Sequence, residues 1–349
     1  MDFGPVTRDP RHLFLDIALT TRCPLHCRYC SVSRELREEL TAGQWKEVVA
    51  SFARLRAIEG ISLEGGEPLI RRDLPELLAA CLGYARSVKV VTGGVIPFQG
   101  LPDELLHHPR FLFELSLAGP EDVHDFLRDN SWGRAWGFLQ AGLARGIRVR
   151  LRSVISRHNL SVYEEWLTRL DKDLSPFGRK VEFIFDTIIA PEAMAGEGGE
   201  VARVSLRNYP AKGLLPAPME MGKLFRRLIR RDFRNLVFSQ NEPLRGCGAG
   251  RMGVVSFDAA GVFSFCCEAP RGIGSIHHFA AEGCLAFLDD QTRNLPCRTC
   301  PYYHGQVCNG CWTGQKCGMV KYWKAKDCQA LHRFMLQEVP FKTREVQTL

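Results

Sequence analysis

Three cysteines stand close together near the amino end of the chain, Cys23, Cys27 and Cys30. Their thiolates are soft ligands of the kind that binds iron and sulfide. A cubane cluster has four irons, so three cysteines leave one iron open to a molecule that can chelate it. A structural zinc site normally closes its fourth position, and in this loop only His26 could do so. The spacing therefore predicts an iron–sulfur cluster with one open corner.

Such a loop needs a rigid support, and the sequence predicts strands that alternate with helices. The β-rich runs lie near Leu13–Leu19, Gly60–Glu64, Val88–Thr92, Leu112–Leu117, Arg148–Val154 and Val181–Ile188. Right-handed crossovers curl a parallel sheet of this kind into a full or partial barrel, with reactive groups on the loops after the strands. We therefore expect an α/β fold, a partial (β/α)6 TIM-like barrel.

Beyond the barrel we expect two further parts. The barrel core covers residues 1–190, a connector with one helix covers residues 191–245, and a small Cys-rich domain covers residues 246–349. The connector's helix, Gly222–Asn235, has a basic face that we expect to be solvated; the alternative is a docking surface for an acidic peptide or an anionic metabolite. So small a Cys-rich segment needs metal to hold its shape.

Composition and charge exclude several classes of protein. Hydrophobic residues make up 45% of the 349 residues and charged residues 24%, as in ordinary globular proteins. The net charge of +7 is too small over this length to predict a nucleic-acid binder. No uncharged apolar run reaches about 18 residues and no secretory signal is present, so we expect no membrane span and a cytoplasmic location. In that reducing compartment, 14 cysteines favour metal binding over disulfides.

Two further groups of polar residues follow predicted strands. Gly65, Gly66 and Glu67 follow the second strand, where glycines let the backbone approach a ligand and the carboxylate can accept from an ammonium. Ser116 ends the fourth strand and Arg128 lies twelve residues later; a hydroxyl and a guanidinium both donate to a carboxylate. The alternatives are a plain turn for the first group and an ordinary helix cap with a surface arginine for the second.

The C-x3-C-x2-C arrangement, with Tyr29 before the last cysteine, resembles the signature of the radical S-adenosylmethionine (radical SAM) superfamily. The resemblance implies that Cys23, Cys27 and Cys30 bind one [4Fe–4S] cluster, whose open iron chelates the amino and carboxylate groups of S-adenosylmethionine. An electron from the cluster then cleaves the sulfonium to a 5′-deoxyadenosyl radical. A flavodoxin- or ferredoxin-type reductant is implied as the source of that electron.

The same resemblance extends to the other two groups. The residues from Gly65 to Glu67 match the family's GGEP motif, which implies that Gly65, Gly66 and Glu67 meet the methionine amino group. Ser116 and Arg128 match a stretch of the anaerobic sulfatase maturases, which implies that both contact S-adenosylmethionine, and we add Tyr29 to the cofactor-binding residues. Ala118 stands where those maturases keep an Asp, so their substrate is not carried over to this chain.

Eight cysteines of the C-terminal part have the spacing of metal ligands: Cys247, Cys266, Cys297, Cys300, Cys308, Cys311, Cys317 and Cys328. Paired C-x2-C turns bring thiolates to one metal and, taken alone, predict a zinc ribbon. After a barrel of this kind they resemble the SPASM extension, which implies two auxiliary [4Fe–4S] clusters. The fit is incomplete because Cys317 is extra, and the partition of Cys311, Cys317 and Cys328 stays open, as does zinc at one site.

Three other cysteines need a different explanation. Cys81 and Cys284 have apolar neighbours, and we expect both to be packing residues. Cys267 directly follows Cys266, at a place where relatives that oxidise sulfatase side chains carry a general base. A thiol there could give a hydrogen atom to a substrate radical as a catalytic residue; the alternative is a spare cluster ligand.

The leading hypothesis is a SPASM-type radical enzyme that abstracts a hydrogen from carbon in a peptide or protein and completes an oxidation or a cross-link. Against it, only 22 residues precede Cys23, which leaves no room there for a separate leader-peptide recognition domain. The second hypothesis is a small-molecule dehydrogenase or epimerase acting on a sugar or aminocyclitol, with Cys267 as hydrogen-atom donor. A non-catalytic iron–sulfur electron carrier would not explain the residues that follow strands two and four.

Overall fold

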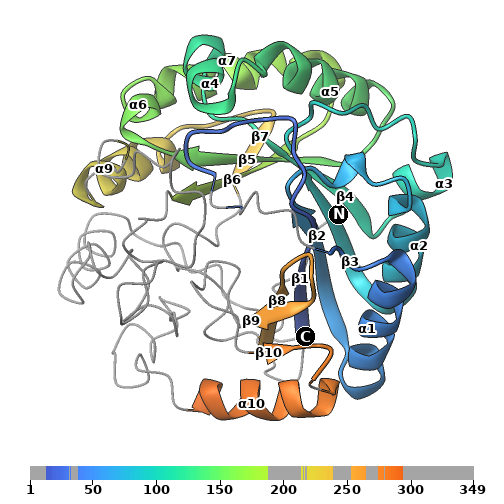
Figure 1. Ribbon diagram of the computed structural model, residues 1–349. Helices are drawn as coiled ribbons and strands as arrows, with labels where there is room; N and C mark the ends of the chain where they lie inside the picture. Colours follow the sequence, from blue (N-terminus) through green and yellow to red (C-terminus); the bar gives the residue numbers. More distant parts are fainter. Residues whose placement is uncertain are drawn as a thin grey trace, which may run out of the picture.

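The computed structural model describes residues 13–30, 32, 38–187, 214, 216, 218–238, 253–264, 274–278 and 280–293. Within these ranges one curved sheet has helices along its convex side (Figure 1). The strands are β1 (Leu13–Thr20), β2 (Ile58–Gly65), β3 (Ala85–Thr92), β4 (Phe111–Ser116), β5 (Val149–Ile155), β6 (Val181–Thr187), β7 (Leu236–Phe238), β8 (Gly253–Phe257), β9 (Val262–Ser264) and β10 (Gly274–Ser275). Their order in the sheet is β10-β9-β8-β1-β2-β3-β4-β5-β6-β7.

Strands β1 to β7 are parallel neighbours in chain order, which is the arrangement of a βα barrel. The connecting helices are α1 (Ala42–Leu55), α2 (Leu74–Tyr84), α3 (Asp103–Leu106), α4 (Glu121–Arg128), α5 (Trp132–Ala144), α6 (Arg157–Leu160), α7 (Tyr163–Asp173) and α9 (Pro218–Ile229). Two short 3-10 helices, η1 (Pro68–Ile70) and η2 (Ser175–Phe177), and helix α10 (Ala281–Arg293) complete the described elements.

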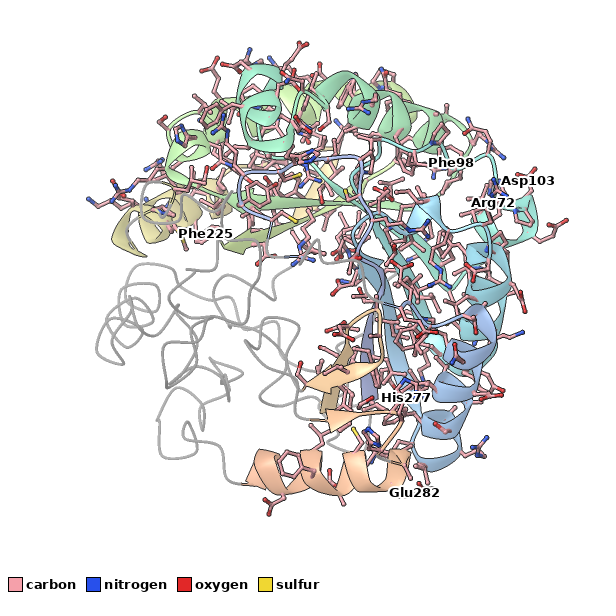
Figure 2. All side chains as sticks on the ribbon, viewed as in Figure 1. Arg72, Phe98, Asp103, Phe225, His277 and Glu282 are labelled. Atoms are coloured by element: carbon pink, nitrogen blue, oxygen red, sulfur yellow. The ribbon has the colours of Figure 1, made fainter. Side chains whose placement is uncertain are left out.

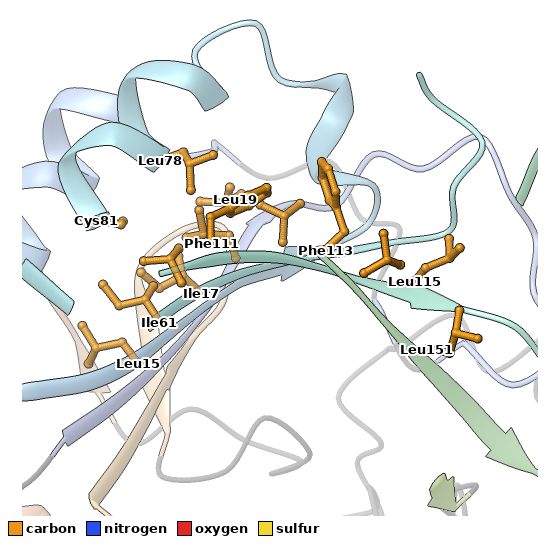
Figure 3. Packing of buried hydrophobic residues seen from close by; sticks show 14 of the residues in the cluster. Leu15, Ile17, Leu19, Ile61, Leu78, Cys81, Phe111, Phe113, Leu115 and Leu151 are labelled. Atoms are coloured by element: carbon orange, nitrogen blue, oxygen red, sulfur yellow. The ribbon is translucent and has the colours of Figure 1, made fainter. Parts of the chain in front are cut away.

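The core lies between the sheet and its outer helices, and the alternation of burial along β1 and β5 shows which side of the sheet faces them. In β1, Leu15 and Ile17 are fully buried and lie in the packing layer that Figure 3 shows, whereas Asp16 between them is only half-buried. From α2, Leu78 and Cys81 enter the same layer. Period-two alternation therefore directs one side of the sheet to the helices and leaves the concave side to polar groups.

The predicted packing roles of the two isolated cysteines are confirmed. Cys81 is 0% exposed and Cys284, on α10, is 2% exposed. Burial raises the pKa of each thiol to about 12, so both stay protonated and inert at neutral pH.

The six strands predicted from the sequence are all present, which confirms the α/β fold class. The sheet also continues past residue 190, where the sequence placed the end of the barrel, because β7 pairs with β6 and β8 pairs with β1. A strand as short as β7, three residues long, is too brief to show period-two alternation in a sequence. The division of the chain into three domains stays a prediction.

Helix α9 lies within the predicted connector but covers Pro218–Ile229 and not Gly222–Asn235, and one of its faces is buried. Leu224, Phe225 and Leu228 are buried. Figure 2 labels Phe225 on α9, and its ring meets Phe185 of β6 edge-on at 5.2 Å between centroids. On the basic face, Arg227 and Arg231 both pair with Glu164 of α7, so part of this charge is neutralised within the chain. None of the described helices is both long and apolar enough to cross a membrane.

Candidate active site

The cysteine loop follows β1 at the carboxyl edge of the sheet, where the sequence placed it. Cys23, Cys27 and Cys30 are half-buried, and none of them forms a disulfide within the described residues. In the part of the chain that the structure describes, no three His, Cys, Asp or Glu side chains converge as ligands of a single metal ion do. A four-iron cluster would attach each thiolate to a different iron, and three thiols carried by one short loop are a donor set that suits such a cluster.

The electrostatics of the loop also fit a cluster. Burial, with the neighbouring thiols and Glu67 adding to it, raises the pKa of Cys23 to about 11. Positive charge from a metal centre would oppose this rise, because it stabilises the ionised form of the Cys23 thiol. The donor set of the loop therefore fits an iron–sulfur cluster.

The carboxyl end of α4 holds one side of the cysteine loop. The Arg28 backbone N–H donates to the Leu127 carbonyl at 2.9 Å, and the Arg28 Nε–H donates to the Phe126 carbonyl at 2.8 Å. The His26 N–H donates to the Asp129 carboxylate at 3.0 Å. Carbonyls in the last turn of a helix lack intrahelical donors, so the loop supplies the partners that α4 needs, and the two segments stabilise each other.

Glu39 holds the other side of the loop. Its carboxylate accepts from the Thr20 hydroxyl at 2.6 Å and from the Thr21 backbone N–H at 3.0 Å. Its second oxygen lies 3.5 Å from the Arg22 guanidinium. The start of the loop is therefore fixed by a residue that sequence reasoning missed, because nothing in the local pattern connects Glu39 to the cysteines.

Gly65 and Gly66 lie against the backbone of the cysteine loop. A Cβ on Gly65 would stand 2.5 Å from the Thr20 carbonyl oxygen, and a Cβ on Gly66 would stand 2.1 Å from that of Arg22. Gly65 also has a φ of 125°, a conformation that favours glycine. The sequence predicts that the glycines let the backbone approach a ligand, and the structure adds that they let it approach the cysteine loop itself.

Glu67 is 1% exposed and connects the ends of β2 and β3. Its carboxylate accepts from the Thr92 hydroxyl and from the Gly93 N–H, both at 2.9 Å, and from the Leu69 N–H at 3.3 Å. Burial raises the pKa of Glu67, although these donors oppose the rise. The carboxylate is therefore an internal anchor of the two strand ends, beside the cysteine loop.

Arg128 presents an unused donor beside the same loop. It is 7% exposed, and its Nη1–H donates to the Tyr29 hydroxyl at 2.7 Å. Its Nε is buried and finds no hydrogen-bond partner among the described residues. Burial alone would lower the pKa of Arg128, but Tyr29 and the thiols of Cys27 and Cys30 raise it, so the guanidinium stays charged. A buried charged donor without a partner is costly unless a ligand uses it.

The structure thus brings together most of the predicted cofactor residues. Arg128 and Tyr29 lie within electrostatic reach of the Cys27 and Cys30 thiols, and Glu67 lies within reach of the Cys23 thiol. Gly65 and Gly66 lie against the backbone of the same loop. Ser116 ends β4 at the same edge of the sheet and is half-buried, opposite Arg152 of β5. Cys267 and the eight predicted auxiliary ligands from Cys247 to Cys328 lie outside the described residues, so their roles stay predictions.

The concave face carries a charged network that sequence reasoning missed. Glu114 of β4 is 0% exposed; its carboxylate lies 3.1 Å from Lys89 of β3 and 3.1 Å from Arg152 of β5. Burial alone would raise the pKa of Glu114, but Lys89, Arg152 and Arg150 together lower it to about 2. The alternating charges of β5, Arg150 and Arg152, were the available signal, since inward positions of a barrel strand recur every second residue.

Two further carboxyl groups on the concave face have raised pKa values, unlike Glu114. Burial raises the pKa of Asp16 of β1. Burial, together with the nearby Asp16, also raises that of Glu64 of β2 to about 7. The face beside the cysteine loop is therefore polar, and burial favours the protonated form of these two carboxyl groups.

The family comparison agrees with this geometry. Residues 17–165 match the model of the Radical SAM superfamily. Over 158 residues the chain is 32% identical to a PqqA peptide cyclase of Xanthomonas campestris pv. campestris (strain B100). That match covers 43% of this chain and 41% of the cyclase, so the match spans about two fifths of the length of this curated relative.

Solved structures show the same fold at low sequence identity. Streptococcus suis SuiB bound to S-adenosylmethionine superimposes with a TM-score of 0.63 at 16% identity, covering 86% of this chain and 73% of SuiB. Native anSMEcpe with bound AdoMet superimposes with a TM-score of 0.63 at 14% identity, covering 94% of this chain and 99% of anSMEcpe. At these identities the likeness extends to the fold alone.

Proposed function

We propose that the protein takes a hydrogen atom from carbon in a peptide or protein and completes an oxidation or a cross-link, as the match of residues 17–165 to the Radical SAM superfamily model supports. When bound, a [4Fe–4S] cluster and S-adenosylmethionine supply a one-electron cleavage that yields a 5′-deoxyadenosyl radical. The observation that carries the proposal is the gathering of three thiols beside Arg128, whose buried Nε has no partner among the described residues.

Each residue of the site has a separate task in this proposal. Cys23, Cys27 and Cys30 hold the cluster. Arg128 donates its unused Nε–H to the carboxylate of S-adenosylmethionine, and this charge-assisted bond offsets the cost of burying the guanidinium. Tyr29 accepts from Arg128 and so fixes the guanidinium plane.

The ends of β2 and β4 complete the cofactor site in this proposal. Gly65, Gly66 and Glu67 shape the wall on the methionine amino side, and Ser116 offers a hydroxyl from β4. Because Glu67 is engaged by Thr92 and Gly93, its carboxylate keeps this wall rigid.

A peptide substrate is supported by the likeness to PqqA peptide cyclases, and the comparisons favour it over the small-molecule alternative. Another solved structure with this fold is Streptococcus suis SuiB bound to precursor peptide SuiA, at a TM-score of 0.58. The polar concave face, with Asp16 and Glu64, is suited to hydrogen-bonding groups of a peptide. Two auxiliary clusters and a flavodoxin- or ferredoxin-type reductant also belong to the proposal.

The proposal is tested on protein reconstituted without oxygen. We expect roughly twelve irons per chain, four for each of three clusters, and formation of 5′-deoxyadenosine from S-adenosylmethionine under reducing conditions. About four irons with tightly held zinc would remove the auxiliary clusters from the proposal. Short peptides encoded in neighbouring reading frames are then assayed for a loss of two hydrogens by mass spectrometry.

A triple variant tests whether the three cysteines of the loop are required for cleavage of S-adenosylmethionine. Replacing Cys23, Cys27 and Cys30 together by Ala should abolish 5′-deoxyadenosine formation, because no other described cysteines lie in that loop. Cys81→Ala is the matched control, since Cys81 is a buried packing thiol, and it should retain activity. Deoxyadenosine formation by the triple variant would defeat the assignment of the site.

A further inference from the structure

His124, on α4, has both ring nitrogens engaged although its side chain is fully buried. The Ala118 backbone N–H donates to Nδ1 at 3.3 Å, and Nε2 lies 3.0 Å from the Ser131 hydroxyl oxygen. The Ser131 hydroxyl in turn donates to the Arg128 carbonyl at 2.6 Å. The Trp132 ring packs against the imidazole in a T-shaped arrangement, with 5.4 Å between ring centroids.

These contacts select one form of the imidazole. A backbone N–H only donates, so Nδ1 of His124 must carry a lone pair. The single proton of Ser131 is used on Arg128, so the Ser131 oxygen accepts from an Nε2–H. Burial, followed by the charge of Arg128, lowers the pKa of His124 to about 3, which keeps this neutral form throughout the physiological range.

The two partners of His124 belong to different parts of the cofactor site. Ala118 lies in the turn that leaves β4 two residues after Ser116. Ser131 lies in the corner between α4 and α5, where Asp129 and Asn130 adopt positive φ values of 61° and 51°. The same corner accepts hydrogen bonds from the cysteine loop, through Asp129 and through the carbonyls of the last α4 turn. His124 is thus the polar cross-connection between the β4 turn and the corner that carries Arg128.

We propose that His124 is a positioning residue for S-adenosylmethionine, because it holds the β4 turn and the α4 corner at a fixed separation and so keeps Arg128 aligned with the cofactor's carboxylate. This inference rests on the proposed function. A helix end alone would not fix that alignment, since a corner of two positive-φ residues has several accessible turn geometries. A buried donor–acceptor chain with every partner satisfied selects one of them.

Three substitutions separate the two contacts. His124→Phe keeps an aromatic ring against Trp132 and loses both hydrogen bonds. His124→Gln places an amide NH2 near the position of Nε2 and can restore the bond to Ser131, whereas His124→Asn places an amide oxygen near Nδ1 and can restore the bond to Ala118. Outer partners of ligating groups change affinity by about 10–100-fold when removed. We therefore expect His124→Phe to raise the KM for S-adenosylmethionine by about tenfold or more.

The test measures cofactor binding as well as turnover. The KM and kcat for 5′-deoxyadenosine are determined together with the change that S-adenosylmethionine causes in the electron paramagnetic resonance signal of the reduced cluster. We expect His124→Phe to retain its iron, to change KM more than kcat, and to need more S-adenosylmethionine for the spectral change. His124→Gln should recover much of the lost affinity. A KM within twofold of wild type in a fully loaded His124→Phe variant would overturn the inference.

Two further variants keep the test decisive. If His124→Phe fails to fold, Ser131→Ala interrupts the same series of hydrogen bonds with a smaller change of volume. This variant should also raise the KM for S-adenosylmethionine at normal iron content, and an unchanged KM would overturn the inference. Cys81→Ala, a buried change outside the site, should leave KM unaltered. Failure of wild-type protein to bind S-adenosylmethionine would reject the proposed function, whereas normal binding by both wild type and His124→Phe would reject only the role of His124.

Discussion

Gly66 makes the closest approach between β2 and the cysteine loop, so Gly66→Ala perturbs the site with a single methyl group. The added Cβ would lie 2.1 Å from the carbonyl oxygen of Arg22 and 2.6 Å from its carbonyl carbon. Both are backbone atoms next to Cys23 and cannot rotate away. Carbon contacts are favourable only from about 3.5 Å, so the loop and the strand end must separate by more than about 1 Å.

The expected cost follows from the contacts that this separation breaks. The Gly66 N–H donates to the Thr20 carbonyl at 2.7 Å, and the Glu67 N–H donates to the Arg22 carbonyl at 2.9 Å. Each such bond contributes about 1 kcal/mol, and overpacking costs about 1–3 kcal/mol more. We therefore expect Gly66→Ala to lower the free energy of unfolding by about 3–5 kcal/mol, with the damage concentrated at the cysteine loop.

The matched control is Gly137→Ala in the middle of α5. A Cβ on Gly137 meets nothing within 4 Å, so the change should stabilise the helix by up to about 1 kcal/mol. Denaturant unfolding gives both free energies, and the effect of S-adenosylmethionine on the cluster's paramagnetic resonance signal reports the loop. If Gly66→Ala unfolds like Gly137→Ala and keeps that spectral response, the reasoning from the backbone contact is refuted.

Two predictions concern buried charge. Glu114→Ala removes the carboxylate that Lys89, Arg150 and Arg152 share. It should lower the free energy of unfolding by about 3–5 kcal/mol in denaturant titrations, and Glu114→Gln should lower it less. Equal stability of Glu114→Ala and wild type would contradict this prediction. The pKa of His124 is 6.5 in the unfolded chain and about 3 in the folded protein. The neutral imidazole therefore contributes to the free energy of unfolding above pH 6.5, and this contribution is lost as the pH falls from 6.5 toward 3. Relative to His124→Phe, the free energy of unfolding of the wild type should fall by about 1.4 kcal/mol for each pH unit across that window. Stability profiles of the two proteins that run parallel with pH would contradict this prediction.

The sheet could be predicted because its strands are long and alternate regularly. β1 has eight residues, and every second one from Leu13 is fully buried. Both the strand and the face that packs against the helices can therefore be predicted from the sequence. β7 has three residues, and its place depends on pairing with β6 and on the packing of α9. Such a strand is specified by tertiary contacts that the local pattern does not contain.

The site was predictable where the chemistry requires particular residue types in a short span. Three thiols with Tyr29 between them, and Arg128 after β4, were identified on that basis. Glu39 and His124 were not, because each acts through a hydrogen bond whose partner is fixed by the fold. Glu39 binds Thr20, 19 residues away, and His124 binds a backbone N–H, a group that every residue but proline offers. The backbone partner of such a side chain cannot be recognised from the residue types in the sequence.

Ala118 holds the turn after β4 through its backbone atoms, whereas its side chain lies in a separate apolar cluster. Its N–H is held by His124 and its carbonyl accepts from the Asn159 side chain at 2.7 Å. The turn is therefore fixed through backbone atoms and does not depend on the side chain at this position. The Ala118 methyl group is fully buried in an apolar cluster with Leu127, against which Tyr29 packs. An Asp there, as in the maturases whose motif this stretch resembles, would place a carboxylate in that cluster at a desolvation cost. The replacement thus preserves the turn and removes a polar group beside Tyr29, which is a reason to seek a substrate different from that of the maturases.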